Sequence, residues 1–137
     1  MLKKPKNFKF KKTHKGRLNY TFNLKQSFLH APYALVSLDS ARLTAAHIAA
    51  AELAIKRVIR KDGTLYTRVF PHLPVTKKPL EVRMGKGKGP ISYWMTRIRP
   101  GTFLFELDCS LPSLATIAFK VAQSKLPFST QILIAKK

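Results

Sequence analysis

The distribution of charge along this chain is the feature that most limits what it can fold into. Lysine and arginine number 26 against 6 aspartates and glutamates, a formal net charge of +20 over 137 residues, and no acid precedes Asp39. Such a chain repels itself when compact unless an anion compensates it. Hydrophobic residues make up 45% of the sequence, enough for a core. We therefore expect a folded core with an anionic partner: nucleic acid, an anionic membrane or an acidic protein.

Residues 1–17 form the most basic segment, and Phe8 and Phe10 stand among its cations. This pattern is typical of a nucleic-acid-binding arm, in which cations meet phosphates and rings stack. A solvated tail is the alternative, although it would gain nothing from the rings. The segment lacks the apolar stretch of a secretory signal and fits a cleavable organellar presequence poorly. The side chains predicted to bind RNA here are Lys3, Lys4, Lys6, Lys9, Lys11, Lys12, His14, Lys15 and Arg17.

Two segments have helical periodicity. The first, residues 45–61, is alanine-rich, can be capped by Thr44, and ends before the turn at residues 62–63. The second begins at Ser113, which can cap it, and ends near residues 126–127; we expect Leu114, Ile117, Ala118, Val121 and Ala122 on its buried face. The end of the first helix carries a basic cluster that suits the helix dipole and is also predicted to bind RNA: Lys56, Arg57, Arg60 and Lys61.

Seven stretches of alternating or β-rich sequence predict strands at residues 18–24, 33–38, 65–70, 80–83, 91–98, 102–107 and 130–134. Prolines at positions 71, 74 and 79 predict an extended connection between two of them. The order β-β-α-β-β-β-β-α-β predicts an α+β fold with a mixed or antiparallel sheet. We expect one domain over residues 1–137, with an arm over 1–17 and a globular core over 18–137.

The stretch VRMGKGKGP at residues 82–90 lies between two predicted strands. Its glycines let backbone N–H groups approach an anion while its lysines reach further. A flexible loop tip is the ordinary alternative. A P-loop would need Ser or Thr after the lysine and a helix beyond it, and a dinucleotide-binding fingerprint would also need a helix. A general phosphate or RNA-backbone contact therefore remains, made by Arg83, Met84, Gly85, Lys86, Gly87, Lys88 and Gly89.

Residues on the predicted strands extend this picture. Arg68, Arg97 and Arg99 could line an exposed sheet face as phosphate contacts. Lys77 and Lys78 precede the glycine–lysine stretch and, with Arg68, are predicted to bind RNA. Tyr93 and Trp94 follow that stretch. They could stack on bases, but strand alternation favours one ring in the core, and we expect that ring to be Trp94.

Other chemistries lack the residues they need. Cys109 is the single cysteine, and the four histidines have no ligand spacing, so we expect no metal and no other cofactor. The few acids form no general acid–base pair and no nucleophile has a partner base, so we do not expect an enzyme. No apolar run is long enough to span a membrane. The basic N-terminal run also lacks the helical stripe of a membrane-surface helix.

Several motifs in order carry a family resemblance: KFKKTHKGR at residues 9–17, ARLTA at 41–45, RVFP at 68–71, TKKPLEVRMGKGKG at 76–89 and YW at 93–94, followed by PG at 100–101 and LFE at 104–106. Together they resemble the bacterial and organellar large-subunit ribosomal protein sixteen, counterpart of eukaryotic cytosolic ribosomal protein ten. The resemblance covers essentially the whole chain, and its RVFP and RMGKGKG elements are the most specific.

The resemblance implies an α+β fold with a β-hammerhead-like element and a structural role in the large ribosomal subunit. It implies binding to large-subunit rRNA near the aminoacyl-tRNA site, with residues 83–89 directed toward the peptidyl-transferase centre and the A-site tRNA. Neighbouring ribosomal proteins are the other implied partners, and no homo-oligomer is expected. An RNA-binding chaperone outside the ribosome is the alternative function, because it would share the charge pattern.

The sequence departs from many bacterial members at residues 28–33, at Ala45-Ala46-His47-Ile48, at Ser92 and at Cys109. Contacts made by residues 18–40 are therefore the least safely carried over. This drift favours an organellar ribosome, in the mitochondrial matrix rather than the plastid stroma, with a bacterial cytoplasm as the alternative.

Overall fold

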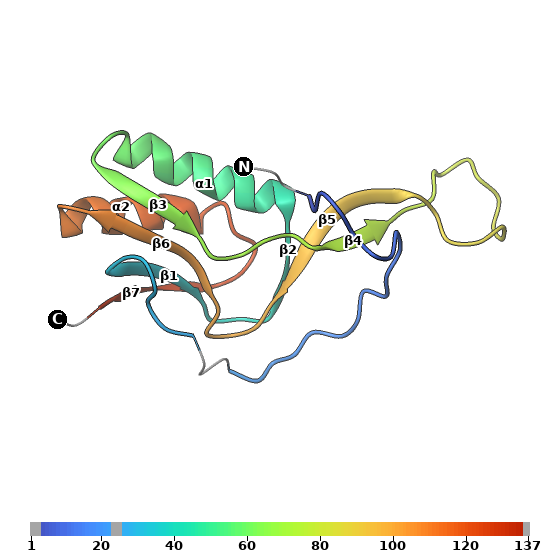
Figure 1. Ribbon diagram of the computed structural model, residues 1–137, viewed down its shortest axis with the longest axis horizontal. Helices are drawn as coiled ribbons and strands as arrows, with labels where there is room; N and C mark the ends of the chain where they lie inside the picture. Colours follow the sequence, from blue (N-terminus) through green and yellow to red (C-terminus); the bar gives the residue numbers. More distant parts are fainter. Residues whose placement is uncertain (1–3, 23–25, 136–137) are drawn as a thin grey trace.

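The computed structural model describes residues 4–22 and 26–135, and Figure 1 shows their arrangement. The elements follow in the order β1 (Tyr33–Ser37), β2 (Ala41–Thr44), α1 (Ala45–Ile59), β3 (Gly63–Thr67), β4 (Leu73–Thr76), β5 (Ile91–Ile98), β6 (Phe103–Cys109), α2 (Pro112–Gln123) and β7 (Thr130–Ile134). All paired strands are antiparallel. The predicted α+β class is therefore confirmed.

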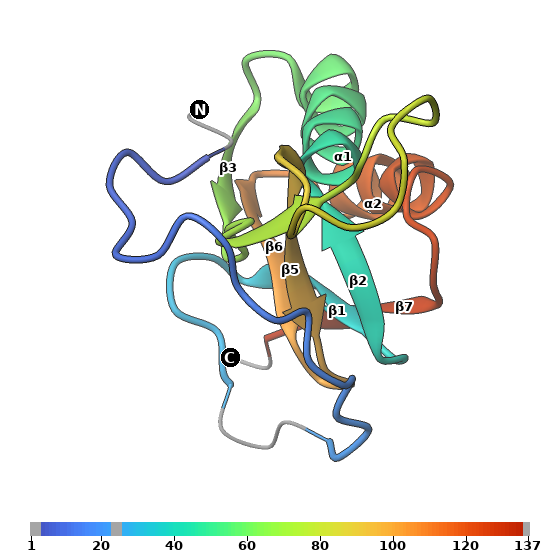
Figure 2. The same ribbon diagram turned by 90° about the vertical axis from the view of Figure 1, so that its right-hand side faces the viewer.

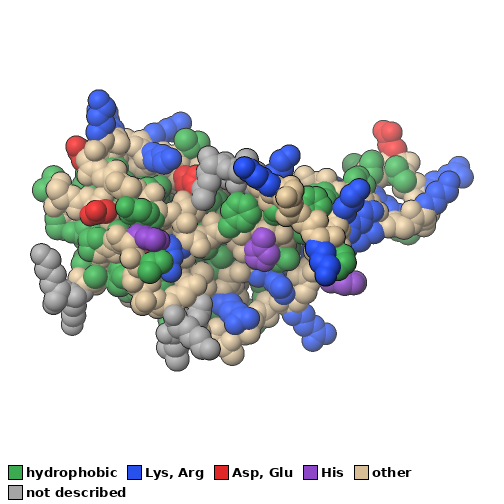
Figure 3. All heavy atoms as spheres, viewed as in Figure 1, with side chains coloured by type: hydrophobic (Ala, Val, Ile, Leu, Met, Phe, Trp, Pro, Cys, Tyr) green, Lys and Arg blue, Asp and Glu red, His purple; other side chains and the backbone are tan. Residues whose placement is uncertain are grey.

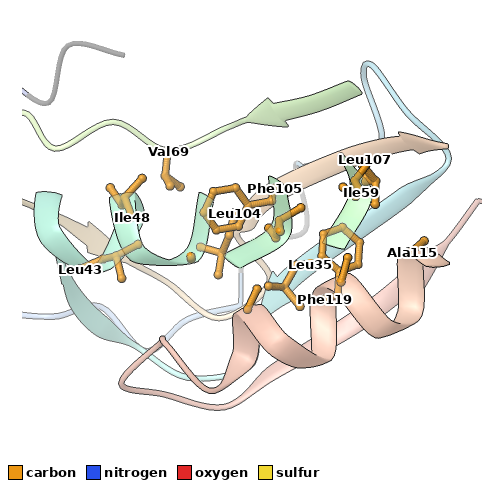
Figure 4. Close-up of a cluster of buried hydrophobic side chains, with 14 of the residues drawn as sticks. Leu35, Leu43, Ile48, Ile59, Val69, Leu104, Phe105, Leu107, Ala115 and Phe119 are labelled. Carbon is orange, nitrogen blue, oxygen red and sulfur yellow. The ribbon is translucent and has the colours of Figure 1, made fainter. Parts of the chain in front are cut away.

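A four-stranded sheet, in the order β3-β6-β1-β7, carries the main core. Leu35 of β1 lies opposite Phe105 of β6 in register, and both are buried in one cluster with Ile55 of α1 and Phe119 of α2. Figure 4 shows Leu35, Phe105 and Phe119 of this cluster meeting between the two helices and the sheet. Fully burying a side chain of this kind stabilises the fold by about 1.5–3 kcal/mol, so this cluster fixes both helices on one face of the sheet.

The opposite face of the four-stranded sheet is covered by the segment before β1. Phe28 packs against Phe103 in a smaller cluster, with ring centroids 5.3 Å apart in an edge-to-face arrangement. The side-chain oxygen of Gln26 accepts a hydrogen bond of 2.6 Å from the backbone N–H of Phe103. The segment therefore belongs to the folded core.

A three-stranded sheet, in the order β2-β5-β4, forms the other half of the structure. Four connections join the sheets: β1 leads into β2, β2 through α1 into β3, β3 into β4, and β5 into β6. At the last of these, Gly101 has a φ of 79° and donates a 2.7 Å hydrogen bond to the carbonyl oxygen of Ser37. The connection between β4 and β5, residues 77–90, projects away from the body of the molecule in Figure 1; we call it the β4–β5 loop.

The strand predicted at residues 18–24 is wrong for residues 18–22, and residues 23–24 lie outside the described part. The side-chain oxygen of Asn19 accepts hydrogen bonds from the backbone N–H and the hydroxyl of Thr21, at 2.9 and 2.6 Å. Such local bonds compete with strand pairing. Tyr20 and Phe22 are exposed, so the alternation of this segment does not mark a buried face.

The strand predicted at residues 80–83 is also wrong. Those residues belong to the β4–β5 loop, where Val82 N–H bonds the carbonyl of Pro79 at 3.4 Å. The strand β4 lies earlier, within the predicted proline-rich connection, and includes Pro74. Proline is tolerated there because β4 is at the edge of its sheet. The short strand β2 was missed, since four residues show little periodicity, and β3 begins and ends earlier than the predicted strand at 65–70.

The helix α1 agrees with prediction at its start and differs at its end, whereas α2 differs at both ends, since it stops at Gln123, before the predicted residues 126–127. Thr44 caps α1, accepting a 3.2 Å hydrogen bond from His47 N–H. The helix ends at Ile59, short of the predicted residue 61. The α2 cap at Ser113 is wrong, because the helix begins at Pro112, which has no N–H to satisfy. Its buried residues are Ala115, Ala118, Phe119 and Ala122, so the predicted face was wrong at Ile117 and Val121, which are exposed.

Candidate nucleic-acid interface

The N-terminal arm lies across the three-stranded sheet, as Figure 2 shows. The ring of Phe8 meets Trp94 of β5 edge-to-face, with centroids 5.3 Å apart. Further along, the guanidinium of Arg42 on β2 donates a 3.1 Å hydrogen bond to the carbonyl oxygen of Gly16, and the hydroxyl of Ser40 donates to the carbonyl of Asn19. The arm is thus held by contacts with the sheet, although it contains neither helix nor strand in its described residues 4–22.

Lysines join the arm to the β4–β5 loop in both directions. The ammonium group of Lys12 donates to the carbonyl oxygen of Lys88, and the ammonium group of Lys88 donates a 2.6 Å hydrogen bond to the carbonyl oxygen of Thr13. Backbone carbonyls accept these bonds without cancelling the positive charge. The contact therefore brings two basic segments, distant in sequence, into one electropositive surface.

Glycine serves two purposes in the β4–β5 loop. Gly85 and Gly87 have φ values of 92° and 82° with open space around them, so they supply backbone conformation. Gly89 lies at the neck of the loop, where a Cβ would come within 2.8 Å of the carbonyl oxygen of Lys77, so it permits close approach of the two sides. The loop thus has a narrow neck and an open tip.

The tip of the β4–β5 loop is exposed and carries apolar as well as basic side chains. Leu80 is 96% and Met84 99% exposed. Lys86 has a φ of 54°, in the left-handed region that lysine seldom adopts. The side chains of Arg83, Lys86 and Lys88 are exposed around them. This combination offers cations for phosphates and apolar groups for ribose or base surfaces, as RNA recognition requires.

The predicted RNA contacts fall into two groups in space. Arm and loop cations lie together, whereas the cluster of residues 56–61 is at the far end of α1, beyond the four-stranded sheet (Figure 1). Basic side chains gather over the loop end of the molecule in Figure 3. Lys3 lies outside the described residues. The exposed predicted contacts are Lys4, Lys6, Lys9, Lys11, Lys12, His14, Lys15, Arg17, Lys56, Arg57, Arg60, Lys61 and Lys77, while Lys78 is half-buried.

Arg68 differs from the other predicted contacts. Its guanidinium forms an ion pair with Glu106, whose side chain is fully buried, and also donates a 3.3 Å hydrogen bond to the carbonyl oxygen of Ser27. The same carboxylate accepts backbone hydrogen bonds of 2.7 Å from His30 and 3.3 Å from Leu29. These contacts give Arg68 a structural role in pinning residues 26–30 to the sheet, and RNA binding by it stays a prediction.

Trp94 lies neither fully in the core nor fully exposed for stacking on bases, the two possibilities considered from the sequence. It is half-buried, whereas its neighbour Tyr93 is exposed. What covers Trp94 is the arm, through Phe8. Sequence reasoning missed this pairing and also Arg42 as an anchor for the arm. The aromatic residues among the N-terminal cations could have indicated this pairing, because an aromatic ring gains stability by packing on an apolar surface.

The remaining reactive groups form no evident catalytic arrangement in the described residues. Burial raises the pKa of the Cys109 thiol, and the nearby Asp108 carboxylate adds to the rise, against hydrogen bonds that involve the backbone of Leu111 and Ala115. The thiol is therefore protonated near neutral pH, unlike an activated nucleophile. Within residues 4–22 and 26–135, no group of three His, Cys, Asp or Glu side chains could hold a metal ion, and no helix has the length and apolarity to cross a membrane.

Comparison with known proteins agrees with the resemblance. The family described as ribosomal protein L16p/L10e matches residues 5–133. The large ribosomal subunit protein uL16 of Blochmanniella pennsylvanica is 45% identical over 97% of this chain and 98% of its own length. The uL16 proteins of Psychrobacter arcticus and Sphingopyxis alaskensis are 46% and 44% identical over 94% of this chain, and 94% and 90% of their own lengths. The chain belongs to the L16p/L10e family of ribosomal proteins.

Membership of the L16p/L10e family confirms the expectation drawn from the sequence motifs. The match extends from the arm to the last strand, so the arm and the β4–β5 loop are both parts of the family pattern. These relatives are bacterial and give no support to the predicted mitochondrial location.

Proposed function

We propose that this chain is a structural, non-catalytic constituent of the large ribosomal subunit that binds large-subunit rRNA and neighbouring ribosomal proteins. The observation that carries the proposal is the family match over almost the whole chain, to relatives named as large-subunit proteins. The charge supports it, because a net +20 needs a polyanion of the kind rRNA provides. The bacterial relatives make a bacterial cytoplasm the favoured location, ahead of the mitochondrial matrix and the plastid stroma.

We further propose that the arm and the β4–β5 loop form the main rRNA-binding surface, near the aminoacyl-tRNA site and the peptidyl-transferase centre. Support comes from the lysine hydrogen bonds that join these two segments and from the exposure of the loop tip. In this arrangement the arm serves assembly of the subunit, and the loop tip supports the A-site tRNA. The basic cluster at residues 56–61 would contact a separate part of the rRNA.

Sedimentation of native lysate on sucrose gradients tests the function, with the chain quantified by mass spectrometry and organelle fractions run separately. We expect one copy per large subunit, retained at moderate salt. A chain that runs free, or with heterogeneous RNA, would instead support the RNA-binding chaperone. The fraction that contains the chain also decides between the bacterial and organellar locations.

Binding of the free protein to large-subunit rRNA fragments should depend steeply on salt. Each phosphate neutralised by lysine or arginine releases a counterion, so affinity should fall by roughly a thousandfold or more over a fourfold rise in salt concentration. Filter binding at several salt concentrations measures this slope. A shallow slope would mean that few of the arm and loop cations contact phosphate.

A further inference from the structure

A pocket of about 200 Å³ lies where the arm crosses the three-stranded sheet, and it is lined by Arg17, Asn19, His72, Arg97, Ile98 and Arg99. Three parts of the chain build it: the arm, the connection between β3 and β4, and the end of β5 with the residue after it. The lining contains three arginines and no aspartate or glutamate, a composition that favours an anion.

The guanidinium groups of this pocket have few partners in the protein. Each has five N–H donors, yet with the described residues Arg97 makes one hydrogen bond, of 3.4 Å to the carbonyl oxygen of Arg17. The structure shows none for the side chains of Arg17 and Arg99 with residues 4–22 and 26–135. Cations that converge without a counter-charge repel each other. An oxyanion in the pocket would accept several of these hydrogen bonds and remove the repulsion.

Asn19 of the pocket is also oriented toward an acceptor. Its side-chain oxygen already accepts two hydrogen bonds from Thr21, which leaves its NH₂ group to donate. The Nδ1 atom of His72 lies 3.2 Å from the carbonyl oxygen of Phe70. A neutral ring that donates from Nδ1 has an acceptor at Nε2, so neutral His72 gives an anion no donor, and the donors for an anion are those of Asn19 and the arginines.

Gly16 positions one wall of this pocket. Its φ is +65°, and a Cβ at this residue would lie 2.4 Å from Nη1 of Arg97. The absence of a side chain thus lets the guanidinium lie against the backbone of the arm. A ligand held by Arg97 would therefore contact the arm and the sheet together.

We propose that this pocket binds a phosphodiester group of RNA, and that the bound phosphate fixes the arm across the three-stranded sheet. The proposal rests on the rRNA-binding function above and adds a defined anion site to it. Phosphate is the group that fits, because guanidinium pairs it through two parallel hydrogen bonds. The arm would then be held weakly in the free protein and firmly once RNA is bound.

Titration of the full-length, isotope-labelled protein with dimethyl phosphate tests the site, at ionic strength held constant with sodium chloride. The reporters are the backbone amide of Gly16 and the indole N–H of Trp94, followed by NMR. The chief variant is Arg99→Gln, because its side chain makes no hydrogen bond with the described residues and its loss leaves the arm contacts intact. The matched control is Lys120→Gln, an exposed cation on α2 that removes the same charge.

We expect a saturable shift in the wild type and the Lys120→Gln variant, and about tenfold weaker binding in Arg99→Gln, the loss of one charge-assisted hydrogen bond. Equal titrations of the two variants, or no saturable response in the wild type, would overturn the proposal. Inorganic phosphate is titrated in parallel. If it binds more than tenfold tighter than the diester, a free anion is the natural occupant and the RNA assignment is wrong.

The second part of the proposal is tested in assembled large subunits. Trypsin should cleave the arm faster in subunits that contain Arg99→Gln than in those that contain Lys120→Gln. Equal cleavage would overturn the role in fixing the arm. If the wild-type chain is absent from large subunits, the proposed function fails, whereas the titration of the free protein still decides whether the pocket binds phosphodiester.

Discussion

Arginine side chains have different partners beside the two sheets of this protein. Beside the four-stranded sheet, Arg68 is paired with the buried carboxylate of Glu106. On the three-stranded sheet, Arg42 and Arg97 donate to backbone carbonyls of the arm instead. A carboxylate cancels a positive charge, whereas a carbonyl oxygen only accepts its hydrogen bond. Arg68 is therefore compensated within the protein, whereas Arg42 and Arg97 keep their charge for an external anion.

The distribution of acids explains this division. Glu52, Asp62, Glu106 and Asp108 lie on α1, after α1 and on β6, and Asp39 follows β1, where its carboxylate accepts a 3.1 Å hydrogen bond from Ser129 N–H. On the side of the three-stranded sheet, Glu81 in the β4–β5 loop is the one acid among residues 4–22, 41–44 and 73–99. The half that contains the four-stranded sheet thus has nearly all the carboxylates.

Replacing Glu106 by alanine should lower the free energy of unfolding more than any other variant, because it removes the carboxylate that compensates Arg68. The change leaves Arg68 unpaired and removes the acceptor for Leu29 and His30 N–H, and we expect a loss of about 3–5 kcal/mol in the free energy of unfolding. Urea denaturation measures it. Asp108→Ala, at the exposed acid two residues on, should change stability by about 0.5 kcal/mol or less. An equally small loss of stability in Glu106→Ala would mean that the buried ion pair does not hold residues 26–30 to the sheet.

Gly89→Ala should have the next largest effect on stability. It places a side chain at the neck of the β4–β5 loop, next to the three-stranded sheet. The new Cβ would contact the backbone of Lys77, and we expect a cost of about 1–3 kcal/mol as the neck opens. Gly87→Ala is the control, since it meets open space and incurs only the left-handed backbone strain of about 1–2 kcal/mol.

The expected costs of the two glycine variants overlap, so the position of the structural change distinguishes them. Gly89→Ala should shift the NMR signals of β4 and β5, whereas Gly87→Ala should change signals of the loop tip alone. Spectral changes confined to the tip in both variants would show that the neck tolerates a side chain, and that Gly89 has no packing role.

Strands could be predicted from the sequence in both halves. Those at 33–38, 102–107 and 130–134 belong to the four-stranded sheet and the one at 91–98 to the three-stranded sheet, and all were placed within a few residues because their apolar or alternating pattern marks a strand. The resemblance supplied the family, and charge alone indicated a polyanionic partner. Even the order of elements was right, but partly by coincidence, since two wrong strands, at 18–24 and 80–83, stood in for the missed β2 and for β4.

The three-stranded side was harder to predict because its contacts are not periodic. Nothing in the sequence indicates that Lys12 and Lys88 exchange hydrogen bonds with each other's segments, or that Phe8 covers Trp94. Arg68 and Arg97 look alike in sequence, yet one is paired and the other is part of a pocket. Such differences depend on tertiary placement, so the basic surface could be predicted from composition and its division could not.

Phe8→Ala tests how the arm is held on the three-stranded sheet. The edge-to-face contact with Trp94 is worth about 0.5–1.5 kcal/mol, so the part of the arm around residue 8 should detach from β5 with little loss of global stability. The hydrogen bonds further along, at Lys12 and Gly16, remain. Because Trp94 is the single tryptophan, its fluorescence and its quenching by acrylamide report the change directly. Phe10→Ala is the control, since Phe10 is exposed and lies under Lys9 of the arm itself. Equal quenching of the two variants would contradict a docked arm.

Lys86→Ala and Lys88→Ala should affect stability least, by about 0.5 kcal/mol or less for exposed lysines, and they separate two roles within one loop. Lys88 holds the arm through Thr13, whereas Lys86 makes no hydrogen bond to the described residues. Lys88→Ala should therefore weaken both incorporation into the large subunit and binding of A-site tRNA. Lys86→Ala should weaken tRNA binding alone.

Gradient sedimentation and tRNA filter binding to purified large subunits measure the two effects of these lysine variants. Deletion of residues 1–16 gives the reference for incorporation, since it removes the arm and should reduce incorporation most. If Lys86→Ala reduced incorporation as much as that deletion, the loop tip would be an assembly contact. The half that contains the three-stranded sheet would then serve only to bind rRNA, and its projecting loop would have no separate role toward tRNA.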